Sequence, residues 1–133
     1  MSKEQPRSLS DGELSALKTL WRHGAQTAGE VREHVNRDGR AWAYTTTKTI
    51  LDRLEEKGYV RRKRTSTPHV YVPIVSPEMV ARHRLGAIRR ELFDGSRLPL
   101  IRALVQDFGL KSDELAELRA LLDAHAREEE EKK

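Results

Sequence analysis

The spacing of apolar residues changes once in the first part of this chain, and this change constrains the fold more than any other feature. Early apolar residues such as Leu14, Leu17 and Trp21 recur every three or four positions, which is the period of an amphipathic helix. Between Val70 and Ile74 they alternate with other residues, which is the period of a β-strand. The pattern therefore predicts helices first and a small sheet after them.

Capping signals divide the helical part into three short helices. Ser10-Asp11-Gly12-Glu13 and Thr27-Ala28-Gly29-Glu30 both have the sequence of a capping box, which satisfies backbone N–H groups at a helix start. A third helix is expected to begin between residues 43 and 45 and to end at Lys57, before Gly58. Its buried stripe, at positions i, i+3, i+4 and i+7, is expected to be Thr47, Ile50, Leu51 and Leu54.

A β-hairpin is predicted directly after the third helix. Residues 59–64 and 69–74 are rich in Val, Tyr and charged residues, and Thr65-Ser66-Thr67-Pro68 between them is typical of a turn. Three short helices followed by a hairpin is the order of a winged helix-turn-helix domain. We therefore predict a mainly α fold with a small β-hairpin, and place the winged-helix domain at residues 9–75.

Residues 76–127 are predicted to form a separate helical dimerisation domain. With about fifty residues, this segment is too short to hide its apolar stripes alone. We expect it to pack against a second copy as a homodimer; the alternative is that its helices fold back onto the first domain. Residues 1–8 and 128–133 are expected to be disordered tails. The expected dimer contacts are Val80, Ile88, Leu92, Leu104, Leu115, Leu118 and Leu122.

Composition excludes several classes of protein. The chain has no cysteine, which excludes disulfides and thiolate chemistry. It has no long apolar stretch and no apolar signal region, so we expect a cytoplasmic protein with no membrane partner. The five histidines show no i,i+4 pair, and the aromatic content is 5%, so neither a metal nor a cofactor is expected. We find no catalytic motif and expect no enzyme.

The predicted third helix has no acid in its leading half. With Thr47 facing inward, the outward positions before Asp52 carry hydroxyl groups and one cation. Such side chains can bond bases and phosphates when a helix enters the major groove. The alternative is that the threonines only cap the helix and that Lys48 pairs with Asp52. The outward residues are Tyr44, Thr45, Thr46, Lys48 and Thr49.

The basic charge of the chain is concentrated on the third helix and the hairpin. Residues 40–72 hold eight basic and three acidic residues, whereas residues 113–133 hold four basic and eight acidic ones. Arg61-Arg62-Lys63-Arg64 alone places four cations in a row. A basic run is often only a solvated surface. Beside an acid-free helix edge, however, it favours double-stranded DNA as the partner.

Segments 14–31 and 44–60 resemble the penicillinase repressor family, most specifically in the elements Tyr-Thr-Thr, Thr-Ile-Leu, Arg-Leu and Lys-Gly. The resemblance runs from Leu9 to about Ala124. It implies a homodimeric winged-helix repressor that binds a palindromic DNA operator. It further implies operator contacts from Thr45, Thr46, Lys48, Thr49 and Arg53, and backbone contacts from the wing residues Arg62, Arg64 and His69.

The chain departs from the family pattern in two respects. Copper-responsive members sense copper through clustered cysteines, and this chain has none. In antibiotic-responsive members a sensor-linked protease cuts an Asn-Phe bond, and the corresponding pair here is Asp107-Phe108. Two other functions are compatible with the sequence. One is a winged-helix module that binds protein, and the other is a ligand-responsive repressor with an effector between its domains.

Overall fold

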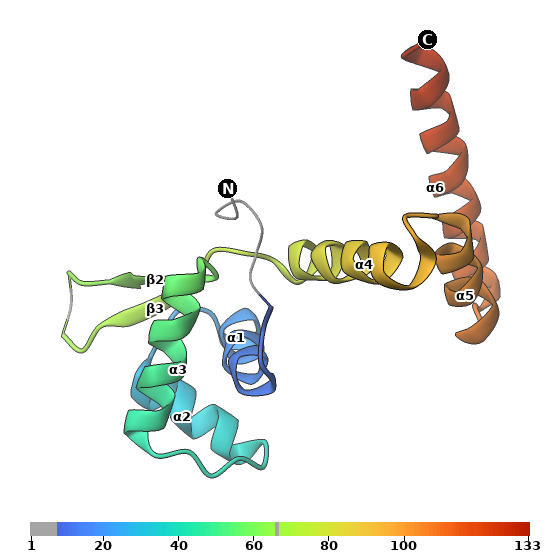
Figure 1. Cartoon of the computed structure of the whole chain (residues 1–133). Coiled ribbons are helices and arrows are strands. Elements are labelled where there is room, and N and C mark those ends of the chain that lie inside the picture. Colours follow the sequence, from blue (N-terminus) through green and yellow to red (C-terminus); the bar gives the residue numbers. More distant parts are fainter. Residues whose placement is uncertain (1–7, 66) are drawn as a thin grey trace. The chain divides into compact units, whose positions relative to one another are not determined.

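The computed structural model describes residues 8–65 and 67–133 (Figure 1). The predicted N-terminal tail therefore lies outside the described residues except for Ser8. The chain divides into two compact units, Met1–Gly86 and Ala87–Lys133. In chain order the elements are α1 (Asp11–His23), β1 (Gln26–Thr27), α2 (Ala28–Arg37), α3 (Tyr44–Lys57), β2 (Val60–Lys63), β3 (Val70–Pro73), α4 (Pro77–Phe93), α5 (Leu98–Asp107) and α6 (Ser112–Glu131).

Local capping sets the ends of the first three helices. Ser10 Oγ accepts from the backbone N–H of Glu13 at 3.2 Å, and Glu13 Oε1 accepts from the backbone N–H of Ser10 at 2.9 Å. The same box, with the same two distances, joins Thr27 and Glu30 at the start of α2. Gly58 ends α3 at a φ of +88°, a conformation that favours glycine. Both predicted boxes and the predicted end of the third helix are confirmed.

A small antiparallel sheet completes the first unit. Its strand order is β1-β3-β2, with Arg62 opposite Tyr71 on one side of β3 and Gln26 opposite Tyr71 on the other. The hairpin of β2 and β3 was predicted. The two-residue strand β1 was not, because two residues are too few to show an alternating pattern. The fold is mainly α, with the helix and strand order of a winged helix-turn-helix domain.

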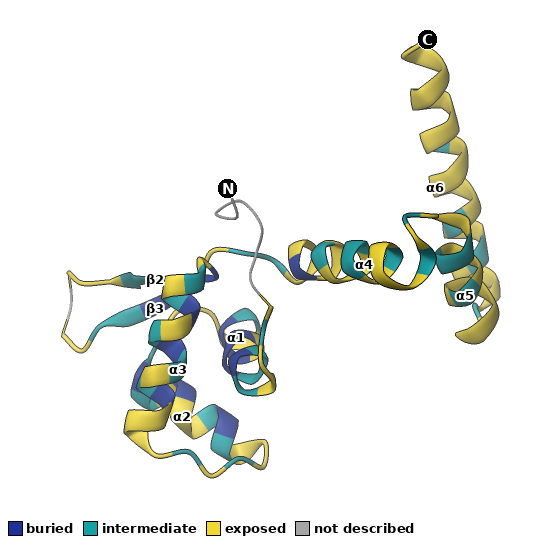
Figure 2. Cartoon of the chain, viewed as in Figure 1, coloured by how far each residue is buried: buried dark blue, intermediate teal, exposed yellow. Residues whose placement is uncertain are grey.

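The core of the first unit lies among α1, α2, α3 and the sheet (Figure 2). Three of the four residues expected to form the buried stripe of α3, Thr47, Leu51 and Leu54, are buried. Ile50 is only partly buried and packs at the edge of the core. The hydroxyl of Thr47 donates to the carbonyl of Ala43 at 3.0 Å, which satisfies a polar group in an apolar setting.

Val80 also belongs to this core, although we predicted it to be a dimer contact. The reason is that the two units separate inside α4, after Gly86, and not before it. The first turns of α4 are therefore part of the first unit. The side chain of Trp21 fixes the segment before α4, because its Nε1 donates to the carbonyl of Val75 at 2.8 Å.

The second unit has amphipathic helices but no buried residue among those described from Ala87 onward. Many of its large apolar side chains are exposed to solvent; Leu92, for example, is 71% exposed. Helix α6 continues to Glu131, through residues that we predicted to be a disordered tail. Glutamate has a good intrinsic helix propensity, which accounts for the extension.

Candidate nucleic-acid interface

The N-terminal half of α3 presents the side chains that the helical period placed outward. Tyr44, Thr45, Thr46 and Thr49 are exposed, and Lys48 is half-buried. The first turn of α3 contains no acidic residue, so nothing there opposes an anion at the positive end of the helix dipole. This edge can donate hydrogen bonds from hydroxyls and from one ammonium group.

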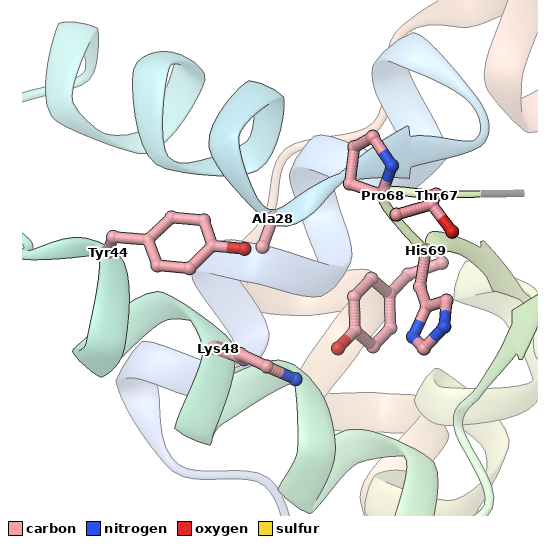
Figure 3. A pocket seen from close by; sticks show the side chains of 7 residues that line it. Ala28, Tyr44, Lys48, Thr67, Pro68 and His69 are labelled. Carbon is pink, nitrogen blue, oxygen red and sulfur yellow. The ribbon is translucent and has the colours of Figure 1, made fainter. Parts of the chain in front are cut away.

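Two hollows adjoin this edge of α3. One, of about 290 Å³, opens between α3 and residues 67–69 at the loop end of the hairpin, and Figure 3 shows Tyr44, Lys48 and His69 around it. The second, of about 310 Å³, is lined by Thr45, Thr46, Thr49, Ile50 and Arg53. Seven of the nine residues predicted to contact DNA line one of these hollows: Tyr44, Thr45, Thr46, Lys48, Thr49, Arg53 and His69. Arg64, the eighth, lines neither of the two.

The ninth, Arg62, is turned toward α3. Its guanidinium Nη1 lies 3.5 Å from Asp52 Oδ1, and its Nη2 lies 3.7 Å from Glu55 Oε1. Glu55 Oε2 also accepts from the backbone N–H of Arg62 at 3.1 Å. The Arg62 side chain is only 18% exposed. We predicted it to contact the DNA backbone, but the structure places it against two carboxylates.

Two further cations and a phenol complete this charge cluster. Lys48 Nζ lies 3.7 Å from Asp52 Oδ2, and Arg64 Nη2 lies 3.8 Å from Glu55 Oε1. The hydroxyl of Tyr71 donates to Asp52 Oδ1 at 2.9 Å. Burial and the neighbouring Asp52 carboxylate raise the pKa of Tyr71 to about 12, so it stays a neutral donor. Two of the three acids of α3, Asp52 and Glu55, thus have partners within the domain, whereas Glu56 is exposed.

Three exposed cations lie near this cluster without such partners. Within residues 8–65 and 67–133, no carboxylate pairs with Arg53, Arg61 or Lys63. Arg61 and Lys63 were not among the predicted contacts. The sequence held a signal for them: Val60 is apolar, so alternation along β2 turns Arg62 inward with it and leaves Arg61 and Lys63 outward.

An ion pair between α1 and α3 supports the position of α3. Lys57 Nζ lies 2.7 Å from Glu13 Oε1 and also donates to the carbonyl of Ser8 at 3.0 Å. The Glu13 side chain is only 2% exposed. Burial alone would raise the pKa of Glu13, but Lys57 and the hydrogen bonds from Ser10 outweigh it and hold that pKa below its ordinary value of 4.5.

The described residues hold no group of three or more His, Asp or Glu side chains that could bind a metal ion. Two of the histidines are in contact: the rings of His23 and His34 stack with their centroids 3.8 Å apart, a contact that sequence spacing did not predict.

In the described part of the chain no helix combines the length and the apolar character needed to cross a bilayer. Elsewhere, Asp107 is the last residue of α5, and Phe108 after it is 74% exposed.

Comparison with known proteins gives one consistent result. The family model described as penicillinase repressor matches residues 9–124. The transcriptional regulator BlaI of Mycobacterium tuberculosis is 34% identical over 116 residues, which cover 86% of this chain and 82% of that protein. The penicillinase repressor of Bacillus licheniformis is 23% identical over 123 residues, with coverages of 92% and 95%. The solution structure of the DNA-binding domain of the repressor BlaI aligns at 27% identity and a TM-score of 0.49, over 55% of this chain and 88% of that one.

Proposed function

The chain belongs to the penicillinase repressor family and is a DNA-binding transcriptional repressor, and we propose that it acts in the cytoplasm as a homodimer on a palindromic operator. The observation that carries the proposal is the exposed, acid-free leading edge of α3. A duplex carries one negative charge per about 1.7 Å of its axis, so an acid-free helix start can approach it without repulsion.

In this proposal α3 enters the major groove and the hairpin follows the DNA backbone. The hydroxyls of Thr45, Thr46 and Thr49, with Lys48 and Arg53, would contact base edges and phosphates. The exposed cations Arg61 and Lys63 and the residues Arg64 and His69 would serve as phosphate contacts. Phosphate contacts fix the register on the duplex, while contacts to base edges supply the sequence preference.

The homodimer in this proposal forms through the second unit. The exposed apolar surface of this unit would be buried if the same helices of a second copy packed against it with two-fold symmetry. Ile88, Leu92, Leu104 and Leu122 are exposed, and Leu115 and Leu118 are half-buried. Two related α3 helices would then read half-sites about one helical turn apart, which requires a palindrome.

We also propose that a sensor-linked protease relieves repression by cutting the chain between Asp107 and Phe108. The Asp107-Phe108 bond lies at the C-terminal end of α5, and the exposure of Phe108 makes it accessible in the single chain. Cutting there would remove α6 from the dimerisation helices. Mass spectrometry after incubation with the induced sensor system of the same cell should find a fragment that ends at Asp107, and its absence would refute this step.

Selection of bound duplexes from a random pool tests the main proposal. We expect an enriched palindrome whose binding weakens steeply as salt is added, because phosphate contacts release counterions. A winged-helix module that binds protein would enrich no sequence and would show no steep salt dependence. A repressor that holds an effector would be stabilised thermally by candidate small molecules, and the palindrome-bound complex would dissociate when they are added.

A further inference from the structure

The cluster of Arg62 with Asp52 and Glu55 joins the wing to α3 at the surface that is proposed to bind DNA. Arg62 lies within 3.5 to 3.7 Å of both carboxylates. Its Nε is buried and has no hydrogen-bond partner among the described residues. To reach a phosphate, the Arg62 guanidinium would have to break its ion pairs with both Asp52 and Glu55.

The position of Arg62 is important for DNA binding because of the two carboxylates beside it. Asp52 and Glu55 stand on α3 itself, so an approaching duplex brings phosphates toward them. A carboxylate without a cationic partner would repel those phosphates. Lys48 and Arg64 also lie near the acids, but both have more than a third of their side chains exposed and are candidates for phosphate contacts.

Arg62 is the cation that both acids share. If Lys48 turns from Asp52 toward DNA, Asp52 keeps Arg62 and the hydroxyl of Tyr71. If Arg64 turns from Glu55, Glu55 keeps Arg62 through both the guanidinium and the backbone N–H. A single, largely covered arginine therefore compensates both acids while the more exposed cations are released.

We infer that Arg62 is a positioning residue of the repressor: it neutralises Asp52 and Glu55 so that Lys48 and Arg64 are free to bind phosphate, and it makes no phosphate contact itself. This inference rests on the proposed function, because it assigns a role within the DNA-binding surface. It also replaces the backbone contact that the sequence predicted for Arg62.

A double-mutant cycle with the full chain tests the inference against a direct phosphate contact. Arg62→Met removes the charge but keeps an apolar stem of similar length. The variant pair D52N/E55Q removes both acids but keeps oxygen acceptors for Tyr71 and for the backbone of Arg62. Operator affinity is measured for Arg62→Met in the wild-type chain and in the D52N/E55Q background.

We expect Arg62→Met to weaken operator binding by roughly ten-fold in the wild-type chain, because Asp52 and Glu55 would then either hold Lys48 and Arg64 away from the phosphates or face the phosphates unpaired. In the D52N/E55Q background we expect less than about a two-fold change, because Arg62 has nothing left to neutralise. Lys63→Met is the matched control: it removes an exposed cation from the same strand and should change affinity equally in both backgrounds.

A loss of affinity in the D52N/E55Q background as large as in the wild-type chain would overturn the inference, because it would show a direct contact. If Arg62→Met alone does not fold, the triple variant can still be compared with D52N/E55Q, since neither contains an unpaired Asp52 or Glu55. That comparison shows whether Arg62 contacts a phosphate directly. Failure of the wild-type chain to select any duplex would instead refute the proposed function. The two failures are therefore distinguishable.

Discussion

Replacing Lys57 by methionine should destabilise the first unit strongly, because it leaves the buried Glu13 carboxylate without its cation. The two groups lie 2.7 Å apart, and Glu13 is almost fully buried while Lys57 is 21% exposed. Removing one partner of a buried ion pair costs about 3–5 kcal/mol. Because Lys57 is partly hydrated and Ser10 still bonds to Glu13, we expect a smaller loss than this, about 2–3 kcal/mol. The melting temperature should fall by roughly 10–20 °C.

The pH dependence of this loss has a defined sign. In the wild-type chain the pKa of Glu13 is lowered, so its contribution to stability is complete above pH 4.5 and declines as the pH falls through the folded-state pKa. Without Lys57 the buried carboxyl favours its neutral form, which raises its pKa in the folded state. The difference in stability between Lys57→Met and wild type should therefore be largest at neutral pH and should shrink on acidification.

Urea unfolding followed by tryptophan fluorescence measures this difference. Both tryptophans of the chain, Trp21 and Trp42, pack against the core of the first unit, so the signal reports that unit alone. Lys63→Met, which changes an exposed lysine without a carboxylate partner, is the control and should stay within about 0.5 kcal/mol of wild type. A Lys57→Met loss of that small size at pH 7, or one equally large at pH 4, would refute the reasoning.

The proposed DNA and dimer surfaces and the second capping box lead to three further expectations. Lys48→Ala and Arg53→Ala should each weaken operator binding and reduce its logarithmic salt slope by about one, as measured by mobility shift at several salt concentrations; full-strength binding by both would show that the reading surface is elsewhere. Leu118→Asp should give monomers in sedimentation and lose tandem half-site binding, and a persistent dimer with normal binding would contradict the dimer assignment. Thr27→Ala should lower the free energy of unfolding by about 1 kcal/mol through loss of the α2 cap, and an unchanged urea midpoint would argue against that contribution.

Much of the first unit could be predicted from the sequence because its signals are local. The capping boxes at Ser10 and Thr27 and the end of α3 at Gly58 each depend on residues within one helical turn of one another. The outward direction of Thr45 and Thr49 follows from the helical period once Thr47 faces inward. Such features need no knowledge of distant parts of the chain.

Contacts between elements were harder to predict. Val80 joins the core of the first unit because α4 begins within that unit, which no local pattern in 76–93 indicates. The strand β1 exists only because β3 pairs with it. These features depend on packing between segments that are far apart in the sequence.

The sequence alone determined which residues carry positive charge, where α1 and α2 begin and where α3 ends, because covalent neighbours decide these features. Only the tertiary structure decided what each cation faces. Alternation along β2 separates Arg62 from Arg61 and Lys63, but only the packing of β2 against α3 brings Asp52 and Glu55 to Arg62 and leaves the other two cations without a carboxylate among the described residues. A side chain's charge is intrinsic, but its partner is set by the surface on which its strand is packed.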